Sequence, residues 1–393
     1  MVGLMKKKIL IFDTHPVQYR VQIYQALAKI DGLDLKVVYS NNSSVVGRLD
    51  QEFGVKIAWD IPLEEGYAHR YVSTVMPDTR IPEFFQFEHR GVGKILREER
   101  PDIVFVNGLT TRFYLAAYFA ALSQGVPVWM RTETQDEAFK RSRLKSFARW
   151  IIWTAAYSGL ARSFYIGELN KAHLLAHGVP ARRLVRANYA TFDRFKLLSA
   201  DDKSARRAAM RAQLGIGDDQ AVVTFSGKLI PKKNPALMIE ALKRRSDKER
   251  FVLLFLGDGE LRADLEREAA AAGLEARFPG FVNQLGLIDY YLASDIMVLP
   301  SNQSGETWGL VVNEGMQAGC GIIVSKGAGS YADFDGLEQV RVIEIGDADG
   351  LALAMGELSA YPRRFDWAEI VLKTYSIDAT VNAIAGEMEK LKA

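Results

Sequence analysis

Two glutamates, Glu306 and Glu314, stand eight residues apart in the second half of the chain. The pattern around them predicts a strand end, a loop, a helix and a glycine stop. Gly309 allows the backbone to approach a ligand closely, and the unpaired N–H groups of Leu310 and Val311 open the helix, which suits an anion such as a diphosphate. Glu306 would then accept hydrogen bonds from sugar hydroxyls, and Glu314 from the paired hydroxyls of a ribose. A plain connection with two surface glutamates is the alternative.

A second segment carries positive charge to the same region. Lys228 and Lys233 follow the first predicted strand of the second half, within residues 225–235. Both would leave the carboxyl end of that strand on the rim that holds Glu306, where two cations can neutralise a departing diphosphate without a metal ion. A solvated basic loop is the alternative, and we interpret Lys232 in that way.

The elements that must position these residues alternate regularly along the chain. Predicted strands lie at 8–12, 35–39, 103–106 and 126–130 in the first half, and at 222–225, 251–256, 296–299 and 322–324 in the second. Helical patterns fall between them at 17–29, 112–122, 235–243, 261–272, 285–293 and 310–318. This alternation predicts an α/β fold with two doubly wound parallel sheets facing each other across a cleft. Such sheets bind ligands beyond the carboxyl ends of their strands.

Length and composition set the outer limits. A chain of 393 residues exceeds the usual size of a single hydrophobic core. A polar stretch at 191–211 predicts a boundary between a first domain at 1–195 and a second at 205–374. The tail at 375–393 has helical spacing, and it is either a plain terminal helix or one that crosses back onto the first domain.

Charge and apolar runs exclude several classes of protein. Lys plus Arg (50) nearly balances Asp plus Glu (48), so no strong overall field favours nucleic acid. Cys320 has no partner for an internal disulfide, the apolar run at 9–12 is too short for a secretory core, and no run reaches the roughly 18 apolar residues of a membrane span. We expect a cytoplasmic protein.

The second half resembles a known family. Its ordered motifs are Gly227-Lys228-Leu229 with Lys233, Gly257-Asp258-Gly259-Glu260, Gly280-Phe281-Val282, Glu306-x7-Glu314 and Gly319. Together they resemble glycosyltransferase family 4, a group of retaining, nucleotide-sugar-dependent enzymes with the GT-B fold of two Rossmann-like domains. The resemblance implies that the first domain binds the acceptor and the second binds the donor.

The resemblance also implies roles for particular side chains. Lys228 and Lys233 would hold the diphosphate, Glu314 the ribose, and Phe281 and Val282 would border the base. The implied donor site comprises Gly227, Lys228, Lys233, Gly257, Phe281, Val282, Glu306, Trp308, Gly309, Leu310, Val311 and Glu314. Glu306, Lys233 and Lys228 are the candidates for catalysis. The family usually has glycine where Asn234 stands and Phe or Tyr where Trp308 stands, and both replacements are compatible with the motif.

The first half departs from the family pattern. Its opening strand runs into residues 13–20 without the usual glycine-rich turn, and Glu133 stands where many members carry a histidine. A catalytic histidine is therefore not carried over to that place. His15 is the remaining candidate to donate to a sugar hydroxyl or phosphate, its alternative being a helix-entry histidine held by its neighbours. We expect His15, Gln18, Tyr19 and Glu133 to line the acceptor side.

Residues 139–157 combine five basic side chains with large aromatic and aliphatic ones at helical spacing. Such a helix can lie on an anionic bilayer, which would suit a lipid-linked acceptor. Packing of the aromatic face into the core is the more frequent arrangement. The sequence leaves both open.

The sequence therefore predicts a retaining hexosyltransferase (EC 2.4) that moves sugar from a UDP- or GDP-sugar to a glycan or lipid-linked acceptor in cell-surface polysaccharide or glycolipid synthesis. It would need no cofactor or metal, bind no nucleic acid, and lie in the cytoplasm or peripherally on the inner membrane face. The Asp-x-Asp pairs at 333–335 and 347–349 are interpreted as chance matches to a metal signature. The alternatives are a GT-B epimerase or phosphorylase, and a non-catalytic sugar-nucleotide-binding protein.

Overall fold

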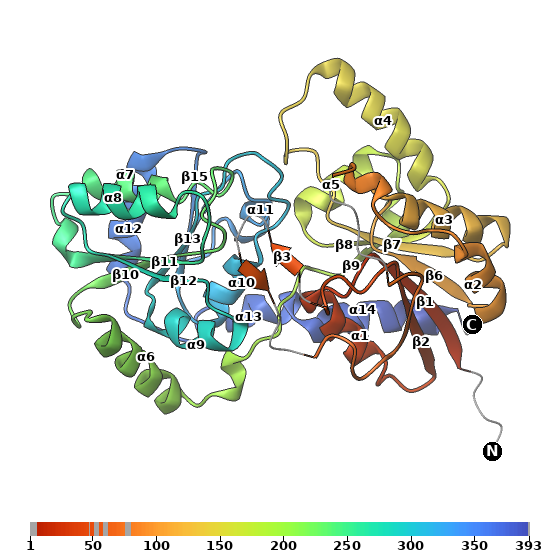
Figure 1. Ribbon diagram of the computed structural model, residues 1–393, viewed down its shortest axis with the longest axis horizontal. Helices are drawn as coiled ribbons and strands as arrows, with labels where there is room; N and C mark the ends of the chain where they lie inside the picture. The colour runs from red at the N-terminus through yellow and green to blue at the C-terminus, as the bar shows by residue number, and fades with distance from the viewer. Residues whose placement is uncertain (1–5, 47, 51–54, 58–61, 75–79, 392–393) are drawn as a thin grey trace.

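The computed structural model describes residues 6–46, 48–50, 55–57, 62–74 and 80–391, which form two lobes side by side (Figure 1). Each lobe contains a parallel sheet with helices on both faces. The expected α/β architecture of two doubly wound sheets is confirmed.

The first sheet has seven strands in the order β5-β2-β1-β6-β7-β8-β9, and all its pairs are parallel. Its strands are β1 (Lys7–Asp13), β2 (Leu33–Tyr39), β5 (Ala68–Tyr71), β6 (Ile103–Val106), β7 (Val128–Thr132), β8 (Leu160–Tyr165) and β9 (Leu184–Arg186). Its helices are α1 (Gln18–Leu27), α2 (Val92–Glu99), α3 (Arg112–Ser123), α4 (Arg143–Tyr157) and α5 (Glu168–Ala176). A separate antiparallel pair joins β3 (Arg48–Asp50) to β4 (Val55–Ile57).

The second sheet has six parallel strands in the order β12-β11-β10-β13-β14-β15. They are β10 (Ala221–Ser226), β11 (Phe251–Leu256), β12 (Ala276–Gly280), β13 (Ile296–Leu299), β14 (Gly321–Ser325) and β15 (Val340–Ile343). The accompanying helices are α6 (Ala200–Leu214), α7 (Ala236–Lys243), α8 (Arg262–Ala271), α9 (Gln284–Ala293), α10 (Leu310–Gln317), α11 (Tyr331–Phe334), α12 (Ala348–Ser359) and α13 (Glu369–Leu372). The central strands are wholly buried because helices cover both faces, which explains their continuous apolar runs.

The last helix, α14 (Ile377–Lys390), packs against α1, so the second connection returns the chain to the first lobe (Figure 1). The Arg162 guanidinium donates to the Glu387 carboxylate at 2.5 Å. The two segments in which the chain passes between the lobes also contact each other. Asn188 Nδ2 donates to the Thr374 carbonyl at 3.2 Å, and Thr380 Oγ1 donates to the Asn188 carbonyl at 3.0 Å.

Candidate functional site

In each sheet the strand order reverses at one place, and parallel sheets bind ligands at such a switch point. In the second sheet the reversal lies between β10 and β13, which pair directly. The loops that follow these two strands are residues 227–235 and 300–309, the segments that the sequence singled out. In the first sheet the reversal lies between β1 and β6, so residues 14–17 and 107–111 face the same cleft.

An ion pair connects the two loops of the second lobe. The Lys233 ammonium donates to the Glu306 carboxylate, and both side chains are largely buried. The lysine loop follows Ser226, the last residue of β10, whose hydroxyl hydrogen-bonds the Tyr291 hydroxyl at 2.7 Å. A cation and an anion therefore meet beside the switch point, where the sequence expected them on one rim.

The start of α10 has the backbone geometry that the motif requires. Gly309 adopts a φ of 99°, and a Cβ there would lie 2.2 Å from Leu299 Cδ2, so only glycine fits. Asn234, in the lysine loop, has a φ of 53°, which explains why glycine is usual at this position and why asparagine is tolerated. Both loops thus turn through conformations that most residues avoid.

Glu314 lies one helical turn after Leu310, so the two side chains share one face of α10. The Tyr291 hydroxyl donates to Glu314 Oε2 at 3.1 Å. Burial raises the pKa of the Glu314 carboxyl to about 7, opposed by the Tyr291 hydrogen bond and by the Arg194 charge. The acid form of Glu314 is therefore favoured below neutrality.

A cavity of about 300 Å³ lies between the lobes at this face of α10. Its polar lining includes His15, Gln18 and Tyr19 from the first lobe and Arg194, Gln284 and Glu314 on the other side. Arg194 donates to Gln284 at 3.1 Å. Sequence reasoning missed these two residues, because neither belongs to a motif.

A larger cavity of about 590 Å³ adjoins the first one through His15, Val17 and Tyr19, which line both. Its polar lining includes Arg20, Asn107, Thr111 and Glu133 from the first lobe and Thr307 from the second. His15 stacks on Phe87 with ring centroids 6.4 Å apart, and Thr14 Oγ1 lies 3.1 Å from its Nδ1. His15 is thus held by its neighbours and also lines both cavities. A structural role at the start of the helix and a role in ligand binding are therefore compatible.

A network of buried hydrogen bonds, which the sequence did not reveal, fixes charged side chains beside the larger cavity. Arg20 donates to Asp13 at 2.7 Å and to Glu133 at 3.0 Å. The carboxylate of Asp13 is fully buried and also accepts the hydroxyl groups of Tyr24 and Tyr114. Glu133 is one-third exposed, so it can present its carboxylate to a ligand while Arg20 fixes its position.

Several predicted donor residues have buried side chains or lie outside the two cavities. The Trp308 indole is 3% exposed, stacks on Tyr189 and donates to Asn313 at 2.8 Å, so any ligand contact at Trp308 falls to its main chain. A Cβ on Gly257 would lie 1.9 Å from the Gly227 carbonyl, so these glycines let two strand ends approach closely. Phe281, Val282 and Val311 are partly buried and do not line either cavity.

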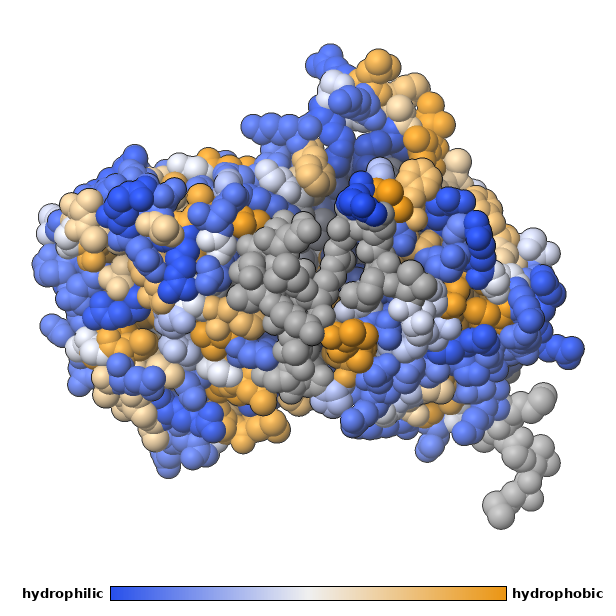
Figure 2. Space-filling view, in the orientation of Figure 1, coloured by the Kyte–Doolittle hydropathy of each residue, from blue (hydrophilic) through white to orange (hydrophobic). Residues whose placement is uncertain are grey.

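The structure decides between the two arrangements left open for α4, because most of its apolar side chains are not packed into the core. Of its residues only Tyr157 is buried, and Leu144, Phe147, Ile151 and Ile152 are 50–79% exposed. The helix projects from the first lobe, and Figure 2 shows hydrophobic and hydrophilic residues side by side over this projection. Helical spacing indicates an apolar face, and no other described element covers it. No helix in the described part of the chain is long and apolar enough to cross a membrane.

The two Asp-x-Asp pairs have structural partners in the fold. Asp333 Oδ2 accepts the Glu168 backbone N–H at 2.9 Å at the start of α5, and its Oδ1 accepts the Tyr375 hydroxyl at 2.9 Å. Burial raises the pKa of Asp333 to about 6. Asp347 caps α12 by accepting the Gly350 N–H at 2.8 Å. Asp333 therefore links the two lobes.

The fold and the charged switch point define a class, the GT-B proteins. HepE from Anabaena, solved in complex with UDP, superposes with a TM-score of 0.71 at 14% identity over 98% of this chain and 100% of that one, which is a likeness of fold alone. Two family models cover most of the sequence: the "Glycosyl transferase 4-like domain" matches residues 19–189, and "Glycosyl transferases group 1" matches residues 206–360. The chain belongs to the family 4 type of glycosyltransferases, as the motifs implied.

Curated relatives match over shorter stretches. The alpha-D-kanosaminyltransferase of Streptomyces kanamyceticus is 35% identical over 143 residues, 35% of each chain. The D-inositol 3-phosphate glycosyltransferase of Geodermatophilus obscurus is 32% identical over 232 residues, 53% of this chain and 49% of that one. The match thus spans between a third and a half of the length of these relatives.

Proposed function

We propose that the protein is a retaining glycosyltransferase that moves a hexose from a UDP- or GDP-sugar to a glycan or lipid-linked acceptor, in cell-surface polysaccharide or glycolipid synthesis. The observation that carries the proposal is the pairing of Lys233 with Glu306 at the switch point, next to the start of α10. A diphosphate would bind the Lys233 ammonium, and a sugar hydroxyl would then donate a hydrogen bond to the released Glu306 carboxylate. The ribose hydroxyls would bind Glu314. The bound UDP in the HepE structure supports a nucleotide donor.

In the proposed reaction the bond between the anomeric carbon and the diphosphate oxygen breaks, and a bond to the acceptor oxygen forms on the same face. Lys228, Lys233 and the N–H groups at the start of α10 stabilise the negative charge that develops on the diphosphate. The acceptor proton passes to a phosphate oxygen of the leaving group. The two lysines supply the positive charge that a divalent metal ion supplies in other transferases, so the transfer itself needs no metal.

The test is turnover and donor hydrolysis in matched variants. A thermal-shift screen with UDP, GDP, ADP, CMP and dTDP first identifies the nucleotide, since only a ligand of the native state stabilises it by mass action. Lys233→Ala and Glu306→Ala should then each lower transfer by about 10²-fold or more, and Lys232→Ala, in the same loop, should not. Unchanged turnover in either site variant refutes the proposal.

The rival functions predict different products. An epimerase would release an altered free sugar nucleotide in the absence of any acceptor. A non-catalytic binding protein would bind the nucleotide sugar and give neither hydrolysis nor transfer across a broad acceptor panel. Product analysis by mass spectrometry and NMR separates the three.

We further propose that α4 holds the enzyme on the anionic inner face of a membrane. Residues 140–157 contain Lys140, Arg141, Arg143, Lys145 and Arg149 and no acidic residue, beside the exposed apolar side chains of the same helix. Flotation with phosphatidylglycerol vesicles should recover the protein, and with phosphatidylcholine vesicles should not. Replacing Arg143 and Lys145 by glutamate should abolish flotation, and Lys94→Glu should not. Equal flotation of all variants contradicts this docking mode.

A further inference from the structure

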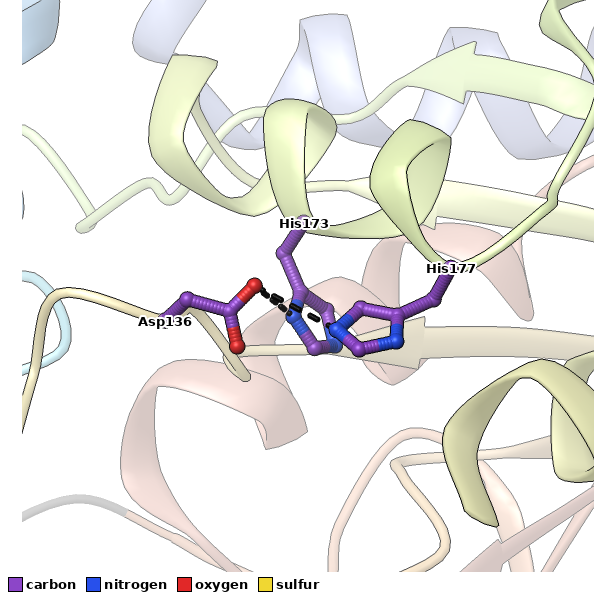
Figure 3. A group of neighbouring side chains, drawn as sticks. All are labelled: Asp136, His173 and His177. Carbon is purple, nitrogen blue, oxygen red and sulfur yellow. Dashed lines mark hydrogen bonds and ion pairs between the residues drawn. The ribbon is translucent and has the colours of Figure 1, made fainter. Parts of the chain in front are cut away.

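Three side chains from two segments of the first lobe meet at one point (Figure 3). Asp136 comes from the loop after β7, His173 from α5, and His177 from the C-terminal end of that helix. Asp136 Oδ2 lies 2.9 Å from His173 Nδ1 and 3.3 Å from His177 Nε2. No motif of the donor or acceptor side includes any of the three.

The spacing and the atom types match a transition-metal site. Histidines four residues apart at the end of one helix present their rings on the same face, as they do in helical zinc motifs. Ligand bonds of about 2.0–2.1 Å in a tetrahedral zinc site place neighbouring ligand atoms roughly 3.3 Å apart. The distance from Asp136 Oδ2 to His177 Nε2 has this value, and the distance to His173 Nδ1 is shorter, so a zinc ion would move this pair apart by about 0.4 Å.

The surroundings also favour a metal ion. Tyr157 OH lies 3.0 Å from His173 Nε2, so the ring nitrogen that faces away from Asp136 has the partner that metal-bound histidines usually have. Both histidines are buried, whereas the Asp136 side chain is 47% exposed, which leaves a path from solvent and room for a water ligand. Arg149 lies 4.0 Å from the other carboxylate oxygen, Oδ1, and leaves Oδ2 to the ion.

We propose that Asp136, His173 and His177 form a binding site for Zn²⁺ or a similar divalent transition metal, completed by water. The site goes beyond glycosyl transfer and is separate from the Lys233–Glu306 pair, so it adds no metal to the proposed reaction.

Its effect would reach the cleft through the loop that carries Asp136. In that loop the Glu137 carbonyl accepts Gln303 Nε2 at 2.6 Å, and the Glu137 carboxylate accepts the Tyr331 hydroxyl at 2.9 Å. The Ala138 carbonyl accepts the Gly305 N–H at 2.9 Å. A metal ion that fixes Asp136 therefore stiffens the connection between the first lobe and the loop that contains Glu306.

The experiment is a titration of tag-free, EDTA-stripped protein with Zn²⁺ alone, followed by calorimetry and by elemental analysis of the dialysed protein. The wild type should bind one ion with micromolar or tighter affinity, and Co²⁺ in its place should give the intense visible absorption of tetrahedral coordination. Asp136→Asn and His177→Gln should each weaken binding at least about 10-fold. His89→Asn, which changes a histidine of the same lobe outside the cluster, should bind like the wild type.

Hydrogen exchange provides a second measurement. Zinc should slow exchange of the amides at 135–139 in the wild type and leave them unchanged in His177→Gln. Absence of a one-to-one complex in the wild type, or zinc binding that survives either substitution in a variant with native circular dichroism, overturns the proposal. Neither result bears on transfer, which is measured separately with the Lys233 variant.

Discussion

Lys233 and Glu306 lie 73 positions apart in the chain, and their side chains form an ion pair between the loops that follow two adjacent strands, β10 and β13. In the absence of a ligand each group neutralises the other. A diphosphate must therefore compete with Glu306 for the lysine, and this competition predicts opposite effects of two substitutions on nucleotide binding.

Replacing Glu306 by glutamine removes the competing anion and leaves the lysine for the phosphate. We expect Glu306→Gln to bind the nucleoside diphosphate about 3–10-fold more tightly than the wild type while transferring sugar far more slowly, and Lys233→Ala to bind it at least about 10-fold more weakly. Isothermal calorimetry with the nucleotide found in the thermal-shift screen checks both. Equal weakening by the two substitutions would show that Glu306 does not oppose the ligand.

Glu314 predicts a pH dependence of stability. Its pKa of about 7 in the folded protein lies above the value near 4.3 of an unfolded chain, so its contribution to stability is present below about pH 4 and is lost as pH rises through 7. Glu314→Gln should raise the free energy of unfolding at pH 8 by up to about 3 kcal/mol and leave it nearly unchanged at pH 4. Urea denaturation at the two pH values measures this. Glu389→Gln on the exposed side of α14 should have no effect at either pH.

The left-handed conformation of Asn234 predicts an order among substitutions. Asn234→Gly should keep the free energy of unfolding within about 1 kcal/mol of the wild type, because easier backbone geometry offsets the greater entropy of the unfolded chain. Asn234→Ala should lose about 1–2 kcal/mol, since alanine has no side chain that favours this conformation. Chemical denaturation of the purified variants gives the order, and an alanine variant more stable than the glycine variant would contradict it.

Gly167 lies where the two lobes press together. A Cβ at this position would lie 2.3 Å from Trp308 Cζ3 and 2.7 Å from Asp333 Oδ2. Gly167→Ala should therefore cost about 1–3 kcal/mol and separate the lobes locally, which small-angle scattering and denaturation can detect. Gly386→Ala is the matched control, because nothing lies within 4 Å of its Cβ in α14 and the change should stabilise the protein by roughly 0.5–1 kcal/mol. Equal behaviour of the two alanine variants would contradict the tight contact.

The fold and the centre of the site were accessible from sequence for a common reason. Central parallel strands are buried on both faces and read as unbroken apolar runs, so the strands at 222–225 and 296–299 could be recognised along with the charged loops that follow them. Strands with mixed residues were missed at the edges of the sheets, and so was β8, which lies inside the first sheet and reads Leu-Ala-Arg-Ser-Phe-Tyr. Strand β5 reads Ala-His-Arg-Tyr and β9 has only three residues, so neither gives an apolar signal.

Other features depend on contacts between distant segments and leave no local pattern. The indole of Trp308 is buried because Tyr189 and Tyr375 stack on it from other parts of the chain. The raised pKa of Glu314 depends on how deeply α10 is packed. Asp136 and His173 are 37 residues apart, and their meeting depends on where the loop after β7 falls against α5. The periodicity of apolar residues along the chain contains no information on such contacts between distant segments.

Asn188 hydrogen-bonds Thr374 on one side and Thr380 on the other, so the two passages of the chain from lobe to lobe run side by side. Two connections that lie side by side would give any movement between the lobes a single hinge. A hinge at this place would let the residues that face each other across the cleft separate and meet again in the same arrangement.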